Sequence, residues 1–297
     1  MFTGLSAFPL TPISEEEVDE AAFAGLVRRL ADAGVDSIGA LGSTGSYAYL
    51  ARDERRALAG IAVEAAGDVP VIVGVGALRT RDVLGHVEDA QAAGAAGLLL
   101  APVAYQALTD EEVYSLYRDV AAAASVPVVV YDNPGTTHVR FSDQLHARIA
   151  RLPGVTAVKI PPVPLEAREA ADRIHALRAV LPEGYGIGIS GDASAAVALA
   201  AGCDAWYSVI GGVLPEPALE IVRAAARGDH QQARAVSARL SPLWSLFGRY
   251  GSLRVAAAIA EHLELIGRPN LPRPLLPLPD EGRRAVGAAL RDLDLAG

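Results

Sequence analysis

The chain has 297 residues, of which 51% are hydrophobic and 21% are charged, a balance that supports a large core and excludes disorder on the scale of a domain. A formal net charge of −9 argues against a nucleic-acid partner, because proteins that bind the phosphate backbone need a basic face. The only cysteine is Cys203, which excludes an intrachain disulfide and favours the cytoplasm. No stretch approaches the ~18 apolar residues of a membrane span, and the N-terminus lacks the cationic start of a signal peptide.

Along the chain, short apolar runs alternate with amphipathic stretches. The runs predict strands over 4–10, 37–41, 69–75, 97–102, 126–131, 155–160, 185–190 and 205–210. The stretches predict helices over 17–33, 52–66, 80–93, 110–124, 142–152, 165–181, 193–201 and 217–227. Runs such as VPVIVGVG and VPVVVY are continuously apolar, which is typical of parallel strands buried on both faces. Eight such units predict a (β/α)8 TIM barrel over residues 1–228, with an open doubly wound sheet as the alternative.

The pattern changes after the eighth unit. Helical periodicity continues over 231–247, 252–266 and 281–293, and a proline-rich linker, RPNLPRPLLPLP, precedes the last stretch. We therefore expect residues 229–297 to form a C-terminal helical extension of the barrel and to contain no second catalytic domain.

The basic residues are unusual, because 25 of the 26 are arginine and only Lys159 is lysine. At an ordinary surface position this chain would use arginine. A guanidinium stays protonated, whereas an amine in an apolar site loses its proton and attacks carbonyl groups. Lys159 lies within the apolar run AVKI, where burial lowers the pKa of an amine. It is the predicted nucleophile.

Three predicted strands carry polar residues at or near their carboxyl ends. In a barrel, the active site lies at the carboxyl ends of the strands. These ends are GSTGS (42–46), YDNPGTT (131–137) and VKIPP around Lys159. Tyr131 is the expected proton carrier. Ser43 and Thr44 are expected to hold a carboxylate, in a turn whose glycines allow positive φ and close approach. Gly191 and Tyr207 are expected to line the same pocket, with packing as an equally good interpretation. The six histidines lack metal-ligand spacing, so no metal is expected; His138 is interpreted as a rim residue, with substrate contact as the alternative.

Together these segments resemble the dihydrodipicolinate synthase and N-acetylneuraminate lyase family of class I aldolases. The turn Gly42 to Gly45 is similar to the family's G-[ST]-T-G, Tyr131 to Pro134 to its Y-[ND]-x-P, and Lys159 to its Schiff-base lysine; ISGDASA (189–195) adds to the likeness. The resemblance implies a (β/α)8 barrel with a helical extension, no cofactor, and a homo-oligomer that is a tetramer or a dimer.

Four positions depart from the synthase pattern. Thr136 stands where synthases have an arginine for the aldehyde's carboxylate, Ser46 replaces a glutamate, and Ile160 replaces a polar residue. The pair of tyrosines after the fourth strand is reduced to Tyr105, the match for a tyrosine of the proton relay. These departures place aspartate semialdehyde in doubt as a substrate.

We therefore predict a Schiff-base lyase that forms or cleaves a C–C bond of pyruvate or a 2-oxo-3-deoxy acid, with an aldehyde or sugar acid as the other partner. Dehydration or deamination of a 2-oxo acid through the same Schiff base is an alternative, as is a true 4-hydroxy-tetrahydrodipicolinate synthase. A barrel that binds an oxo acid without turnover is the alternative from outside the enzymes.

Overall fold

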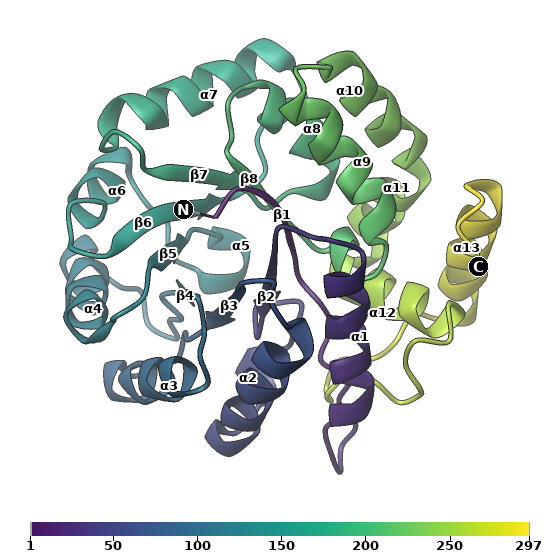
Figure 1. Cartoon of the computed structure of the whole chain (residues 1–297), viewed down its shortest axis with the longest axis horizontal. Coiled ribbons are helices and arrows are strands. Elements are labelled where there is room, and N and C mark those ends of the chain that lie inside the picture. Colours follow the sequence, from purple (N-terminus) through teal and green to yellow (C-terminus); the bar gives the residue numbers. More distant parts are fainter. Residues whose placement is uncertain (1, 297) are drawn as a thin grey trace.

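The computed structural model describes residues 2–296 and is a closed barrel of eight parallel strands surrounded by helices (Figure 1). Each strand pairs with the next in the chain, and β8 closes the barrel by pairing with β1. The (β/α)8 prediction is therefore confirmed, and the open doubly wound alternative is wrong. The strands are β1 Gly4–Ala7, β2 Ser37–Ala40, β3 Val71–Gly74, β4 Gly97–Leu100, β5 Val128–Tyr131, β6 Val155–Ile160, β7 Gly186–Ile189 and β8 Ala205–Ser208.

All eight predicted barrel helices are present, and a side chain caps the start of four of them, at Asp19, Thr109, Ser142 and Glu166. At α4, for example, Thr109 and Glu112 form a capping box that satisfies the free N–H groups of the first turn. The sequence did not predict the short helix α5 Pro134–Thr137. The helices that follow the eight strands are α1 Glu20–Asp32, α2 Arg52–Ala66, α3 Thr80–Ala92, α4 Asp110–Ala123, α6 Asp143–Ile149, α7 Ala167–Val180, α8 Ala195–Ala200 and α9 Pro215–Ala226.

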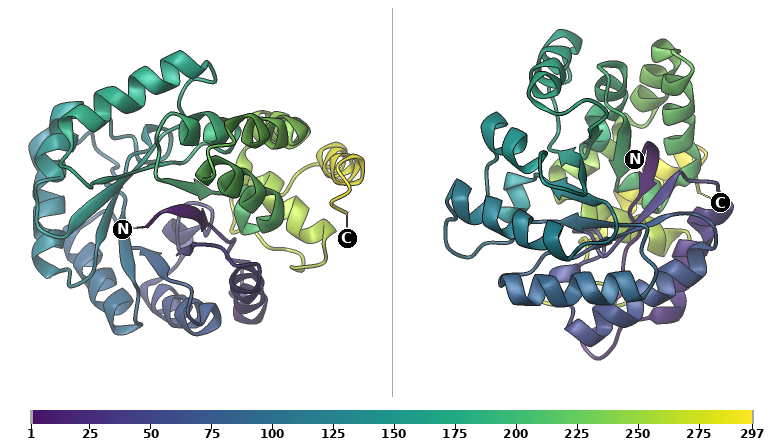
Figure 2. Two further views of the ribbon diagram at one scale, coloured as in Figure 1. Left: turned by 45° about the horizontal axis from the view of Figure 1, so that its top comes forward. Right: turned by 60° about the vertical axis from the view of Figure 1, so that its left-hand side comes forward.

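The extension consists of α10 His230–Arg239, α11 Ser241–Tyr250, α12 Ser252–His262 and α13 Asp280–Asp292. The single helix predicted over 231–247 is wrong, because it breaks at Leu240, just before Pro242 in the first turn of α11. Proline lacks the N–H that would continue the helix, and its ring clashes with a carbonyl of the preceding turn. The α13 helix packs against α11 and α12 at the outer edge of the molecule (Figure 2). The first helix of the extension, α10, packs on the barrel helices α8 and α9. The predicted boundary between barrel and extension, at 228/229, therefore stays a prediction.

Inside the barrel, aromatic rings fill space that glycines leave open. A Cβ atom added to Gly39 would lie 2.3 Å from the Phe8 ring, and one added to Gly188 would lie 2.2 Å from the ring of Tyr207. Both rings are almost completely buried. The interior is therefore packed up to the carboxyl ends of the strands, where the predicted site lies. No helix within residues 2–296 is long and apolar enough to cross a bilayer.

Candidate active site

Lys159 lies near the carboxyl end of β6, and the register places it directly beside Tyr131 of β5. The Lys159 side chain is buried, and its amine Nζ lies 3.9 Å from the centre of the Phe8 ring and 4.8 Å from that of Tyr131. Burial lowers the pKa of this amine, although the nearby Tyr131 and Asp192 oppose the change. A larger fraction of neutral, nucleophilic amine is therefore present near neutral pH than at an exposed lysine.

The Tyr131 hydroxyl is held by two neighbours. It shares a hydrogen bond of 3.1 Å with Ser43 Oγ, and Asn133 Nδ2 donates to it at 3.0 Å. Burial raises the pKa of the phenol, but the charge of Lys159 and the hydrogen bonds that stabilise a phenolate outweigh burial, so the pKa lies below its ordinary value. A phenol with a lowered pKa can give up and take back a proton more readily than an ordinary tyrosine.

The turn after β2 brings Ser43 to Tyr131 and buries Thr44. The expectation that its glycines take up positive φ is wrong: the left-handed residues are Leu41 at φ 56° and Ser46 at φ 52°. The expected close approach is present, because a Cβ atom on Gly42 would lie 2.7 Å from the Phe8 ring. The glycine at this position thus makes room for the ring below the turn.

The other predicted site residues separate into two groups. Tyr207 and Gly191 lie at the carboxyl ends of β8 and β7, with the Tyr207 ring 5.7 Å from Lys159 Nζ. In contrast, Tyr105 lies in the loop after β4 with 90% of its surface exposed, so a single chain does not bring it to the amine. His138 is also exposed, in a left-handed conformation at the end of α5.

A model of the dihydrodipicolinate synthetase family matches residues 1–293. The chain belongs to this family. It is similar to the 4-hydroxy-tetrahydrodipicolinate synthase of Thiobacillus denitrificans, at 36% identity over 96% of this chain and 95% of the relative, and to that of Methylococcus capsulatus, at 33% identity over the same shares. Members of the family are lyases of the aldolase type, and this chain is therefore an enzyme of that class.

Solved structures of the family superpose closely on the barrel and on the extension. A dihydrodipicolinate synthase from Agrobacterium tumefaciens has a TM-score of 0.94 and 46% identity, covering 98% of both chains. A putative dihydrodipicolinate synthetase from Pseudomonas aeruginosa has a TM-score of 0.88 and 30% identity, covering 99% of this chain and all of the other. The resemblance read from the sequence motifs is thus confirmed for the fold and the family.

Sequence reasoning missed three residues of this family site: Asn133, Phe8 and Asp192. Asn133 was part of the Y-[ND]-x-P match but was not recognised as a partner of the tyrosine. Asp192 Oδ1 accepts from Trp206 Nε1 at 3.0 Å, from Ser208 Oγ at 2.8 Å and from a backbone N–H. Burial raises the pKa of Asp192 to about 6. Its place in ISGDASA, after the seventh strand, was the signal that could have identified it.

The segment after Tyr131 is anchored from below by a buried pair. His146 Nε2 on α6 lies 3.0 Å from Asp132 Oδ2, and the imidazole stacks on Phe141 with ring centres 4.9 Å apart. Both partners are almost fully enclosed. The pair therefore ties Asp132, the residue next to Tyr131, to a barrel helix.

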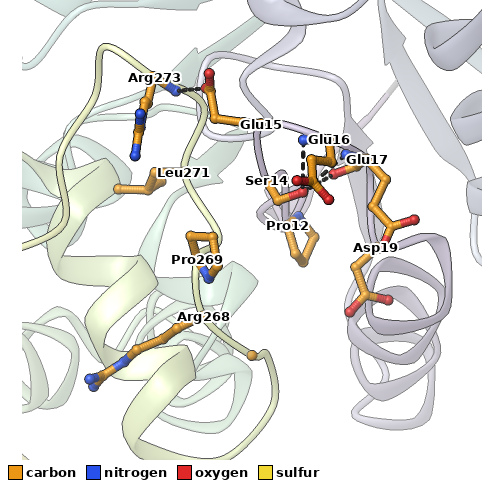
Figure 3. Close-up of a pocket in the computed structure, with 11 residues that line it drawn as sticks. Pro12, Ser14, Glu15, Glu16, Glu17, Asp19, Arg268, Pro269, Leu271 and Arg273 are labelled. Atoms are coloured by element: carbon orange, nitrogen blue, oxygen red, sulfur yellow. Dashed lines mark hydrogen bonds between the residues drawn. The ribbon is translucent and has the colours of Figure 1, made fainter.

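A cleft also lies elsewhere in the molecule. It has a volume of about 490 Å³ and separates the loop after β1 from the proline-rich linker (Figure 3). Four carboxylate side chains line one wall, and Glu15 Oε1 accepts from the Arg273 backbone N–H at 3.0 Å. Neither Lys159 nor Tyr131 lines this cleft, which lies between the barrel and the extension.

Proposed function

We propose that the enzyme binds a small 2-oxo acid, such as pyruvate, as a Schiff base on Lys159 and forms or cleaves a C–C bond next to the iminium. The observation that carries this proposal is the buried Lys159 amine, 4.8 Å from the centre of the Tyr131 ring, whose hydroxyl Ser43 and Asn133 hold. The family membership supports it, because relatives carry the name of a synthase of this type.

The proposed reaction starts with the neutral Lys159 amine, which adds to the C2 carbonyl and gives a carbinolamine. The carbinolamine takes up a proton and loses water, which leaves a cationic iminium. This cation accepts the electron pair of the breaking C–C bond, and in the synthetic direction it loses a C3 proton to give the enamine that attacks the aldehyde. Tyr131 moves the protons in these steps. No metal takes part.

The carboxylate of the oxo acid needs hydrogen-bond donors that fix C2 beside the amine. We assign this task to Thr44, to Ser43 and to the backbone N–H groups of the turn after β2. The turn adjoins Tyr131 through the Ser43 hydrogen bond, so a carboxylate held there would place C2 within reach of both Lys159 and the proton carrier.

The second substrate is proposed to be a neutral hydroxylated aldehyde, or the matching 2-oxo-3-deoxy acid in the cleavage direction. The reason is Thr136, which lies on the short helix α5 close enough to Tyr131 to help lower the pKa of that phenol. The position is thus next to the proton carrier but is neutral. A second carboxylate there would lack a charge-assisted pair worth about 1.5 to 3 kcal/mol.

A comparison of aldehydes tests this choice. We expect kcat/KM for pyruvate with glyceraldehyde to exceed kcat/KM for pyruvate with aspartate semialdehyde, because the missing ion pair weakens binding of the semialdehyde's transition state by roughly ten- to a hundredfold. Thr136→Arg should narrow or reverse the difference. A clear preference of the unaltered enzyme for the semialdehyde would assign it to the synthase function that its relatives' names carry, with a charge supplied from elsewhere, for example by Arg140.

We also propose that the enzyme is a homo-oligomer. Three large side chains are exposed on successive loops: Tyr49 after β2, Leu78 after β3 and Tyr105 after β4, with exposed fractions of 47%, 67% and 90%. Beside them lies a cleft of about 420 Å³ with an apolar part of its lining. In a two-fold dimer, the exposed ring of each copy could pack into the cleft of the other copy, because each copy has both features.

Sedimentation measurements test the oligomer. We expect the unaltered enzyme to sediment as a dimer or tetramer, and Tyr105→Asp to shift the equilibrium toward monomer by placing a charge in the apolar contact. The matched control is Leu276→Asp, because Leu276 is also strongly exposed, at 66%, but lies in the linker of the extension. Equal effects of the two variants, or a monomeric unaltered enzyme, would contradict the assignment of this surface.

A further inference from the structure

Three aromatic rings surround the Lys159 amine. Phe8, which follows β1, lies nearest with its ring centre 3.9 Å from Nζ, and the rings of Tyr131 and Tyr207 are 4.8 and 5.7 Å away. The Phe8 and Tyr207 rings meet edge to face, with centres 6.0 Å apart and planes at 80°. We call Phe8, Tyr131 and Tyr207 the aromatic cage.

The position of Phe8 in the cage is set by the backbone around it. A Cβ atom on Gly39 would lie 2.3 Å from the Phe8 ring, and one on Gly42 would lie 2.7 Å from it. Because these two positions of β2 and its turn are glycines, the Phe8 ring fits against their backbone. The ring is 1% exposed. A ring packed in this way keeps its position relative to the amine.

The amine has no carboxylate partner at short range. Lys159 takes part in none of the ion pairs formed within residues 2–296, and the acid that acts on it, Asp192, has its Oδ1 occupied by donors from β8 and the residue after it. A positive charge on Nζ is therefore surrounded mainly by rings. The face of an aromatic ring carries negative electrostatic potential and attracts a cation within about 6 Å of its centre.

We propose that Phe8 is a charge-stabilising residue of the active site, whose ring face holds the positive charge that the Lys159 nitrogen carries as an ammonium or an iminium. Stabilisation of the ammonium by Phe8 does not depend on the proposed reaction. The iminium part rests on the proposed function: amine and carbonyl combine, one proton is taken up, one water leaves, and the nitrogen retains the positive charge. Phe8 then lowers the energy of the cation without offering a base that could quench it.

The sign of the effect on the amine follows directly. Charged and titratable groups face Lys159 from three sides, namely Tyr131 on β5, Asp192 after β7 and Tyr207 on β8. The first two favour the ammonium, whereas burial disfavours it. Phe8 adds to the favourable side, so weakening its ring potential must lower the pKa of Lys159 below its value in the unaltered enzyme.

The single lysine makes a direct measurement possible. In protein labelled with [13Cε]lysine, one side-chain resonance reports Lys159, and its titration gives the pKa without any substrate. Phe8 is replaced by pentafluorophenylalanine, which has nearly the same shape but a reversed ring potential, and by leucine in Phe8→Leu. Each should lower the pKa by about 0.4 to 1.5, the range expected for loss of a cation–π contact, with the larger change for the fluorinated ring.

The matched control is pentafluorophenylalanine at Phe23, a buried ring on α1, which should leave the titration unchanged. If the fluorinated Phe8 protein titrates like the Phe23 control, the ring acts only through packing and the proposal is wrong, whatever Phe8→Leu does to folding. Added pyruvate then tests the second part at a pH above the measured pKa of Lys159, where the free amine is neutral and only the iminium carries the charge. The labelled carbon should move to an iminium position, and the fluorinated Phe8 protein should need about two- to thirtyfold more pyruvate for the same conversion. Absence of any pyruvate-dependent signal in the unaltered enzyme would overturn the proposed function and leave the ammonium result standing.

Discussion

Replacing Lys159 with methionine is expected to lower kcat/KM by about 10⁴-fold or more, because the amine that forms the covalent bond is lost. Methionine keeps an unbranched stem in the buried space and leaves no unpaired charge there, so the thermal midpoint should stay close to that of the unaltered enzyme. Lys159→Arg should be equally inactive, since a guanidinium stays protonated and does not attack carbonyl groups.

The two variants separate chemistry from folding. Arginine adds a permanent charge to a site whose burial already lowers the pKa of the lysine, so Lys159→Arg should also unfold at a lower temperature. Steady-state kinetics and thermal melts, run side by side, give both quantities. Turnover by Lys159→Met within about tenfold of the unaltered enzyme would be incompatible with a Schiff base at this residue.

Tyr131→Phe is expected to lower kcat by roughly 10²- to 10⁴-fold, the usual worth of a placed proton carrier. The ring and its packing remain, but the hydroxyl that bonds Ser43 and Asn133 disappears. Tyr185→Phe is the matched control. Tyr185 is also a buried phenol with a single bond, 3.0 Å to the Ala157 carbonyl oxygen, and it precedes β7 at the opposite end of the strand from the site.

The control should change stability by about 1 kcal/mol and leave kcat nearly unaffected. The pH profile gives a second check, because the lowered pKa of Tyr131 predicts loss of a kinetic ionisation when the phenol is removed. Equal kcat values for Tyr131→Phe and Tyr185→Phe would assign the proton transfers to another group.

The regular parts of the molecule could be predicted because their pattern is local. Continuous apolar runs placed the eight strands, and the rarity of lysine identified Lys159 within one of them. Once the barrel was predicted, the carboxyl ends of its strands brought Tyr131 and the turn at Ser43 to the same place, and the structure joins them by a hydrogen bond. The sequence pattern located the strands, and the position of barrel active sites at the carboxyl ends of strands located the site.

What could not be predicted depends on contacts between distant segments. Phe8 reads as an ordinary core residue of a strand, and only the glycines at 39 and 42 on the neighbouring strand and its turn place it beneath the amine. His146 gave no signal because it belongs to no motif and lies 14 residues from its partner Asp132, which stands in the Y-[ND]-x-P match. The positive φ of Leu41 likewise needs Gly74 on β3, where a Cβ atom would collide with the Leu41 carbonyl oxygen.

A covalent intermediate on the single lysine can be detected directly by reductive trapping. The unaltered enzyme is incubated with pyruvate and borohydride, digested, and mapped by mass spectrometry, with Lys159→Met as the control. Because the chain has one lysine side chain, the only competing amine is the one at the N-terminus. We expect one reduced pyruvyl group, located on Lys159 and missing from the control. Pyruvate-dependent labelling at the N-terminus alone, with Lys159 unmodified, would contradict the proposed intermediate.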